Sequence, residues 1–249
     1  MRFEVCVESV DGVRAAARAG AHRVELCADL AVGGVTPDLA VVKEALAVAD
    51  AAASVAGADA DPVANGRLGV HVLVRPRGGD FVYSAAEVDV MRRDLAALVD
   101  AGVDGVVVGA LDPAGRVDLA TTRALVDAGR PARVTFHRAF DAAADPLAAL
   151  EALADLGVDR VLTSGAAPTA ADGAGLLARL VEAAGDRLIV LAGGGITDAN
   201  AAVVAAAGVS ELHFSARYPA ADGADHAERI RRIMRAARRG STTPSPQRW

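Results

Sequence analysis

A chain of 249 residues has the typical length of one (β/α)₈ barrel, and it could also hold two small domains. Its hydrophobic content of 53% can bury a large core, but aromatic residues make up only 3%, so valine, leucine and alanine must supply the packing. The formal net charge of −6 argues against nucleic acid as a bulk electrostatic partner. Apolar runs are short and interrupted, so we expect no membrane-spanning segment.

The N-terminus lacks the long apolar core of a signal peptide, since it carries Glu4 and Glu8. We therefore expect a first strand over Phe3–Glu8. A repeated pattern follows, in which a helical segment ends in glycine and a short polar connection leads to a predicted β-strand. Glycine supplies the left-handed residue that ends a helix before the chain turns into a strand. The four repeats are residues 20–26, 102–108, 157–163 and 208–214.

Four further strands alternate with these repeats, namely Phe3–Glu8, Leu68–Arg75, Arg133–His137 and Leu188–Ala192. The segments between them have apolar spacings of three and four, as expected of helices. Eight strands alternating with helices predict an α/β fold, a single TIM-type (β/α)₈ barrel. A doubly wound open sheet is the alternative, but residues 9–12 after the first strand do not form its glycine-rich fingerprint.

We expect the barrel to occupy residues 1–239. The Ala/Asp/Gly-rich residues 50–66 predict a solvated extension on the N-terminal face, and residues 240–249 predict a disordered tail. Asp225–Arg239 predicts a closing helix, and we expect its arginines to form a solvated face.

Polar residues at the C-terminal ends of barrel strands are candidates for a functional site, because the βα loops converge there. Period-two alternation places one charged or histidine side chain from each of four strands on a common face. These residues are Glu8, Glu25, Arg75 and His137. Burying charges is unfavourable unless they pair or serve a ligand, so the alternative is an internal Glu–Arg network that only fills the mouth.

Two loops extend this candidate catalytic rim. The loop after the third strand carries Arg75 and Arg77, which could hold a carboxylate or phosphate, or could form a local Arg–Asp pair in a structural turn. His137 and the nearby Asp141 follow the fifth strand, where a histidine beside a carboxylate could transfer a proton or could be a satisfied buried side chain.

The ends of the seventh and eighth strands are where phosphate-binding barrels place their backbone donors. Here they predict an anion site, although a tight turn that needs glycine is the alternative. The candidate residues, together with Arg77, are Gly193, Gly194, Gly195, Ser215, Ala216 and Arg217. The sequence has no closed zinc motif, and no organic cofactor is evident.

Cys6 and Cys27 are the two cysteines, and we expect free thiols in a cytosolic protein. Soft thiolates favour Cu(I). If Glu8 were level with Glu25, the cysteines would lie about 13 Å apart along the strands and could share neither a metal nor a disulfide. A register that sets Cys6 beside Cys27 would permit a two-thiolate site, and barrel shear leaves both registers open. Ordinary small core residues are the third alternative.

Several blocks of this sequence together resemble the CutC family over about residues 3–217. The most specific are Arg75-Pro76-Arg77-Gly78-Gly79-Asp80-Phe81 and Thr135-Phe136-His137-Arg138-Ala139-Phe140-Asp141. The resemblance implies a TIM-type barrel, a cytoplasmic role in copper homeostasis, copper binding at cysteines matching Cys6 and Cys27, and self-association into a homo-oligomer.

Two functional hypotheses follow, with a vestigial scaffold barrel as the third. The first is Cu(I) binding by Cys6 and Cys27. The second is an enzyme for a small anionic metabolite, phosphorylated or carboxylated, with Arg75, Arg77 and the last two loops holding the anion and Glu8, Glu25 or His137 moving the proton.

Overall fold

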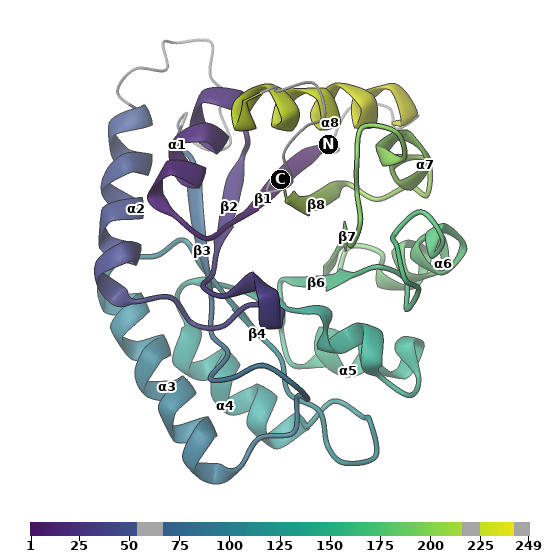
Figure 1. Cartoon of the computed structure of the whole chain (residues 1–249). Helices are drawn as coiled ribbons and strands as arrows, with labels where there is room; N and C mark the ends of the chain where they lie inside the picture. The colour runs from purple at the N-terminus through teal and green to yellow at the C-terminus, as the bar shows by residue number, and fades with distance from the viewer. Residues whose placement is uncertain (54–66, 216–224, 242–249) are drawn as a thin grey trace.

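The computed structural model, which describes residues 1–53, 67–215 and 225–241, is a closed eight-stranded parallel barrel (Figure 1). Each strand pairs with the next along the chain, and β8 closes against β1. The strands are β1 (Arg2–Val7), β2 (Arg23–Leu26), β3 (Gly69–Leu73), β4 (Gly105–Val108), β5 (Arg133–Phe136), β6 (Arg160–Thr163), β7 (Ile189–Gly193) and β8 (Glu211–Ser215). The predicted TIM-type fold is therefore confirmed.

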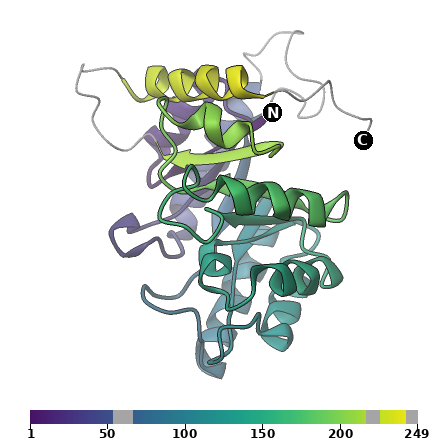
Figure 2. The same cartoon turned by 90° about the vertical axis from the view of Figure 1, so that its right-hand side faces the viewer.

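Helices follow the strands and surround them on the outside, as Figures 1 and 2 show. The α-helices are α1 (Val10–Ala19), α2 (Leu39–Ala53), α3 (Ala85–Asp100), α4 (Leu119–Gly129), α5 (Pro146–Asp155), α6 (Ala174–Ala184), α7 (Ala201–Ala205) and α8 (His226–Gly240). Two short 3₁₀ segments, η1 (Leu30–Val32) and η3 (Arg138–Ala142), lie in the loops after β2 and β5. Helix α8 packs against α7 and α1 beside the junction that closes the barrel.

The predicted glycine repeat has the conformation that its position requires. Gly20, Gly102, Gly157 and Gly208 all have positive φ, between 73° and 87°. Gly20 shows the reason, because its left-handed backbone ends α1 while its N–H donates to the carbonyls of Ala16 and Ala17. The chain can then enter β2 three residues later.

The main apolar core lies between the outward faces of the strands and the helices, where small aliphatic side chains such as Val5, Val24 and Val70 are fully or almost fully buried. The inward faces carry a second, smaller apolar cluster formed by Cys6, Cys27, Leu73 and Val107. The remaining inward positions are mostly polar. The polar and ionisable side chains of the strands are therefore concentrated in the barrel interior.

The pairing register of β1 with β2 decides how these interior residues meet. Glu4 is paired with Arg23, and Cys6 is paired with Glu25. The register in which Glu8 lies level with Glu25 is therefore wrong for this barrel. Cys6 lies one interior position lower than Cys27 on the neighbouring strand, which is the diagonal relation that tilted strands bring into contact.

Three predictions about chain segments fall wholly or partly outside the described residues. Residues 50–53 of the predicted extension belong to α2, and residues 54–66 are not described. The predicted tail begins at Gly240, which is the last residue of α8, and residues 242–249 are not described. Residues 216–224, which include the candidate anion ligands Ala216 and Arg217, are also not described.

Candidate functional site

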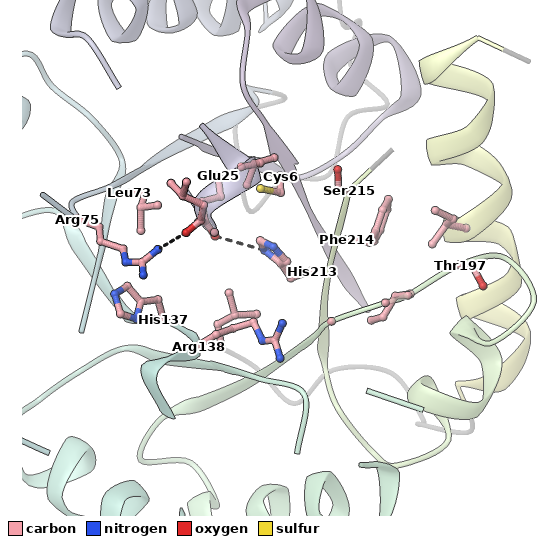
Figure 3. A pocket seen from close by; sticks show the side chains of 18 of the residues that line it. Cys6, Glu25, Leu73, Arg75, His137, Arg138, Thr197, His213, Phe214 and Ser215 are labelled. Atoms are coloured by element: carbon pink, nitrogen blue, oxygen red, sulfur yellow. Dashed lines mark hydrogen bonds and ion pairs between the residues drawn. The ribbon is translucent and has the colours of Figure 1, made fainter. Parts of the chain in front are cut away.

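A cavity of about 940 Å³ opens at the C-terminal ends of the strands (Figure 3). Such a volume is typical of a pocket for a small organic ligand. Residues from β1, β2, β3, β6 and β8 line it, together with segments that follow the strands and with α8. Its polar and charged lining residues are Cys6, Glu25, Arg75, His137, Arg138, Thr197, Asp198, His213, Ser215, Arg229 and Arg232.

Three of the five predicted catalytic-rim residues, Glu25, Arg75 and His137, lie on the wall of this cavity. Figure 3 shows all three around the same space. Glu8 does not line the cavity, and its Oε1 accepts a hydrogen bond of 2.7 Å from the backbone N–H of Leu30 in η1. Glu8 therefore fixes the loop after β2.

Asp141 does not line the cavity either. Its carboxylate accepts hydrogen bonds from the backbone N–H and the hydroxyl of Ser164 and from the hydroxyl of Thr163. It also pairs with Arg138 at 2.7 Å. Asp141 thus ties η3 to the end of β6 and orients Arg138, which does line the cavity.

Arg75 is a buried cation held by backbone carbonyls. Its Nη1 donates to the carbonyls of Val32 and Gly34, and its Nη2 donates to the carbonyl of Gly79 at 2.7 Å. The guanidinium lies 4.9 Å from the centroid of the Phe81 ring. No carboxylate of the described residues pairs with it, and its Nε has no hydrogen-bond partner there. The positive charge is therefore oriented but not neutralised.

His137 presents one ring nitrogen to its own loop and leaves the other without a partner. The Nδ1 atom accepts a 3.1 Å hydrogen bond from the backbone N–H of Ala139, while Nε2 is buried and unpaired among the described residues. Burial, with the charge of Arg75 adding to it, lowers the pKa of His137 to about 3. The neutral ring with Nδ1 as acceptor carries its proton on Nε2, which makes Nε2 a hydrogen-bond donor.

Glu25 is a buried carboxyl on the same wall. Its Oε2 lies 3.5 Å from Nδ1 of His213 and has no hydrogen-bond partner in the part of the chain that the structure describes. Burial raises the pKa of Glu25 to about 7, against the lowering effect of His213. His213 also lies 2.7 Å from Oε1 of Glu4, and although burial opposes it, this hydrogen bond raises the pKa of His213. The oxygens of Glu4 and Glu25 and the nitrogen of His213 are close enough together to hold a metal ion.

Below the cavity the barrel interior is filled by a network of buried charges. Arg23 donates to both Glu4 and Glu211, and Arg160 donates to Glu211 at 3.0 Å. All four side chains are at least nine-tenths buried. Burial opposes the ionisation of Glu4, but the charge of Arg23 and the hydrogen bond to His213 keep its pKa well below its usual range. The internal Glu–Arg network considered as an alternative for the mouth thus exists, one level deeper and with different residues.

Two glycines of the β4 segment make room for the interior histidines. A Cβ atom at Gly105 would overlap the ring of His71, and one at Gly109 would overlap the ring of His137. His71 is fully enclosed, and burial together with the charge of Arg23 lowers its pKa to about 3. The two rings therefore occupy the interior space that a side chain at position 105 or 109 would need.

The two cysteines are neighbours. Their sulfurs lie 3.7 Å apart, both thiols are free, and Cys6 also lines the cavity. The hydrogen bond with Cys27 raises the pKa of Cys6, with further contributions from burial and from the carboxyl of Glu25. The raised pKa favours the thiol form of Cys6, so a thiophilic metal ion would have to displace its proton.

The predicted anion-binding residues divide into two groups. Gly194, Gly195 and Ser215 line the cavity. Gly193 is the last residue of β7, below the rim. Arg77 does not line the cavity, because it is engaged with Glu87 at 2.6 Å and with Asp80 at 3.0 Å. The interpretation of Arg77 as part of a local ion pair in a structural turn agrees with this placement.

Comparison with known proteins identifies the family and agrees with the barrel fold. The family model described as the CutC family matches residues 1–218. A CutC family protein of Xanthomonas campestris is 47% identical over 225 residues, which cover 89% of this chain and 85% of the relative. The chain belongs to the CutC family. The human copper homeostasis protein cutC homolog is 44% identical over 219 residues, covering 86% of this chain and 73% of the relative.

A solved CutC structure from Streptococcus agalactiae has a TM-score of 0.77 and 30% identity, and the match covers 86% of this chain and 98% of that one. A thiamine phosphate pyrophosphorylase from Pyrococcus furiosus matches with a TM-score of 0.61 at 18% identity, covering 96% of each chain, and shows only the shared barrel fold. Within the described part of this CutC family chain, no helix combines the length and apolarity needed to span a bilayer.

Sequence reasoning missed several residues of this CutC family site. Period-two alternation along β8 was sufficient to place His213 inside the barrel with Glu211 and Ser215. The sequence signal for Arg138 was its place directly after His137. For Arg229 and Arg232 the expectation was a solvated helix face, and it is wrong because the position of α8 turns these two arginines toward the cavity. Helical periodicity cannot show this, since it depends on where the helix docks.

Proposed function

We propose that this chain takes part in copper homeostasis by binding Cu(I) between the thiolates of Cys6 and Cys27. The observation that carries the proposal is the distance of 3.7 Å between the two sulfurs. With metal–sulfur bonds of about 2.3 Å, as in zinc thiolates, one ion can bridge sulfurs up to about 4.6 Å apart. Thiolates are the ligands that Cu(I) prefers.

The surroundings of Cys6 and Cys27 support a binding site for copper as cargo, with an affinity that depends on pH. Cys6 faces the cavity, which offers an entry path for the ion, while Cys27 lies behind it and is almost completely buried. Because the pKa of Cys6 is raised, copper must displace thiol protons, and the apparent affinity should rise with pH. Free thiols at this separation also fit a reducing compartment such as the cytoplasm.

Replacement of both cysteines by serine should abolish tight copper binding. We expect the wild-type chain to bind one Cu(I) in competition with a chromophoric Cu(I) chelator, and the Cys6→Ser/Cys27→Ser variant to bind none. Each single variant retains one soft donor and should bind much more weakly than the wild type. Unchanged stoichiometry and affinity in the double variant would contradict the proposal.

A second function is favoured by a different observation, the unpaired polar atoms on the cavity wall. Oε2 of Glu25, Nε2 of His137 and Nε of Arg75 are all buried without hydrogen-bond partners among the described residues. Unpaired buried polar groups are unfavourable and often mark a place where a ligand binds. We propose that the cavity is also the active site of an enzyme for a small anionic metabolite, with Glu25 placed to move a proton and His137 to donate a hydrogen bond.

This second function predicts that small phosphorylated or carboxylated metabolites stabilise the chain. A ligand that binds the folded state at 100 times its dissociation constant adds roughly 2.7 kcal/mol of stability, which is readily seen as a rise in melting temperature. A thermal-shift screen of such compounds measures this directly. The copper-free Cys6→Ser/Cys27→Ser variant serves as the control, because it should respond to the same compounds. A broad screen without any shift would contradict an enzymatic role.

A further inference from the structure

The cavity has a charge opposite to that of the whole chain. Its described wall carries four guanidinium groups, from Arg75, Arg138, Arg229 and Arg232, and two carboxyl groups, from Glu25 and Asp198. The full chain has a formal net charge of −6. A cationic hollow in an acidic protein raises the local concentration of anions and is unfavourable to the empty fold unless a ligand uses it.

Two of the four arginines are accounted for by neighbouring side chains. Arg138 pairs with Asp141 and donates to the hydroxyl of Ser164. Arg232 lies 3.7 Å from the carboxylate of Glu228 on its own helix. These arginines contribute to the field of the cavity, but their charges have partners. The remaining two, Arg75 and Arg229, differ in this respect.

Arg75 and Arg229 each bring a charge that no carboxylate of the described residues neutralises. Arg75 is buried, donates its hydrogen bonds to backbone carbonyls, packs on the Phe81 ring, and leaves Nε without a hydrogen-bond partner among the described residues. Arg229 is half-buried, and its enclosed Nη1 also has no hydrogen-bond partner within residues 1–53, 67–215 and 225–241. A buried charge without a counter-charge is strongly unfavourable, so Arg75 favours an anion from outside the described chain. The half-buried Arg229, with its enclosed Nη1, offers a second place for one.

The two charges enter the cavity from different elements. Arg75 follows β3, and Arg229 belongs to α8, which packs against α1 and α7. In Figure 3 the Arg75 side chain and helix α8 lie on opposite sides of the open space, with His213 between them. His137 lies beside Arg75 in the same view, and its Nε2 donor has no partner among the residues that the structure describes. A single small anion at one of these places leaves the other arginine unneutralised.

We propose that this cavity binds a small metabolite with an anionic group at each end, one held by Arg75 and the other by Arg229. The Nε2 donor of His137 takes an oxygen at the Arg75 end, and Gly194 and Gly195 line the cavity without side chains that would obstruct the ligand. Phosphorylated carboxylic acids and dicarboxylic acids share this chemistry. The proposal rests on the second function above and specifies its class of substrate.

Calorimetric titration of the full-length chain with matched compounds tests the proposal. Phosphoglycolate and malate carry two anionic groups, while lactate and inorganic phosphate represent the two ends separately. We expect at least one compound with two anionic groups to bind at least tenfold more tightly than either lactate or phosphate. Tighter binding by phosphoglycolate than by malate would assign one end to phosphate, and the reverse order would assign both ends to carboxylates.

The Arg229→Gln variant tests the α8 end without disturbing the barrel interior. Its affinity for the preferred compound should fall at least tenfold, toward that of the matching single anion. Arg235→Gln is the control on the same helix, because Arg235 is exposed, pairs with Glu228 and does not line the cavity, and its affinity should be unchanged. Thermal melting of both variants checks that they are folded.

Two results would overturn the inference while leaving the enzymatic proposal intact. One is that single anions bind as tightly as compounds with two anionic groups. The other is that Arg229→Gln binds the preferred compound as the wild type does. If the chain binds no compound in the set and also fails the broader thermal-shift screen, the enzymatic proposal fails with it. The copper proposal is independent of all these outcomes.

Discussion

Replacing Arg23 with methionine is expected to lower the free energy of unfolding by about 3–5 kcal/mol, the usual effect of removing one partner of a buried ion pair. Arg23 donates to both Glu4 and Glu211, and all three side chains are almost fully buried. Without the guanidinium, two carboxylates must either stay charged in the barrel interior or take up protons. Urea unfolding followed by circular dichroism measures the loss.

A surface arginine with equally good geometry provides the matched control. Arg187 makes two hydrogen bonds to Glu151, and both side chains are about half exposed. Because exposed ion pairs contribute about 1 kcal/mol or less, Arg187→Met should change stability little. The loss in free energy of unfolding for Arg23→Met/Glu4→Gln should be smaller than the sum of the losses for the two single variants, since one uncompensated charge is removed. A loss for Arg23→Met as small as that for Arg187→Met would contradict a network of buried charges.

Acidification should destabilise the chain through His137 by about 2 kcal/mol between pH 7 and pH 5. The folded chain holds the pKa of His137 at about 3, whereas the unfolded chain has the ordinary value of 6.5. The unfolded state therefore takes up a proton as the pH falls through 6.5 while the folded state does not. The contribution of His137 to the free energy of unfolding is fully present above pH 6.5 and is lost progressively as the pH falls toward 3.

Other buried groups respond to pH in the opposite direction, so the difference between two variants is the informative quantity. The raised pKa values of Glu25 and His213 favour the folded state at lower pH. His137→Asn keeps a side-chain acceptor for the Ala139 N–H but cannot titrate. Its stability relative to the wild type should rise by about 2 kcal/mol from pH 7 to pH 5. His226→Asn, at an exposed position, should show no such change. A constant difference for His137→Asn would mean that the pKa of His137 is the same in the folded and unfolded chains, which contradicts the prediction.

The barrel and the inward faces were predictable because they depend on local periodicities. Glycine ends the helices, and alternation along each strand assigns its two faces, so Glu25, Arg75 and His137 could be placed at one mouth. What local patterns do not contain is the stagger between strands. The pairing of Cys6 with Glu25 puts the two sulfurs together and leaves Glu8 to hold the η1 loop.

The second kind of information missing from the sequence is how separate elements dock. Arg160 and Glu211 are 51 positions apart and meet only because the barrel closes. Arg229 reaches the cavity because α8 packs against α1 and α7. In the sequence, all three residues resemble ordinary charges on strands and helices. Their interaction partners depend on how the barrel closes and cannot be predicted from the residues adjacent in the sequence.

The pairing of Gly105 with His71 and of Gly109 with His137 constrains how this chain can change over evolutionary time. Neither glycine can gain a side chain while the imidazole opposite it remains, since the two would occupy the same space. A larger residue can therefore replace either glycine only after, or together with, a change of the histidine opposite it. Relatives that replace Gly109 with a larger residue should lack a histidine at position 137, and they would thereby have given up the hydrogen-bond donor at this end of the cavity.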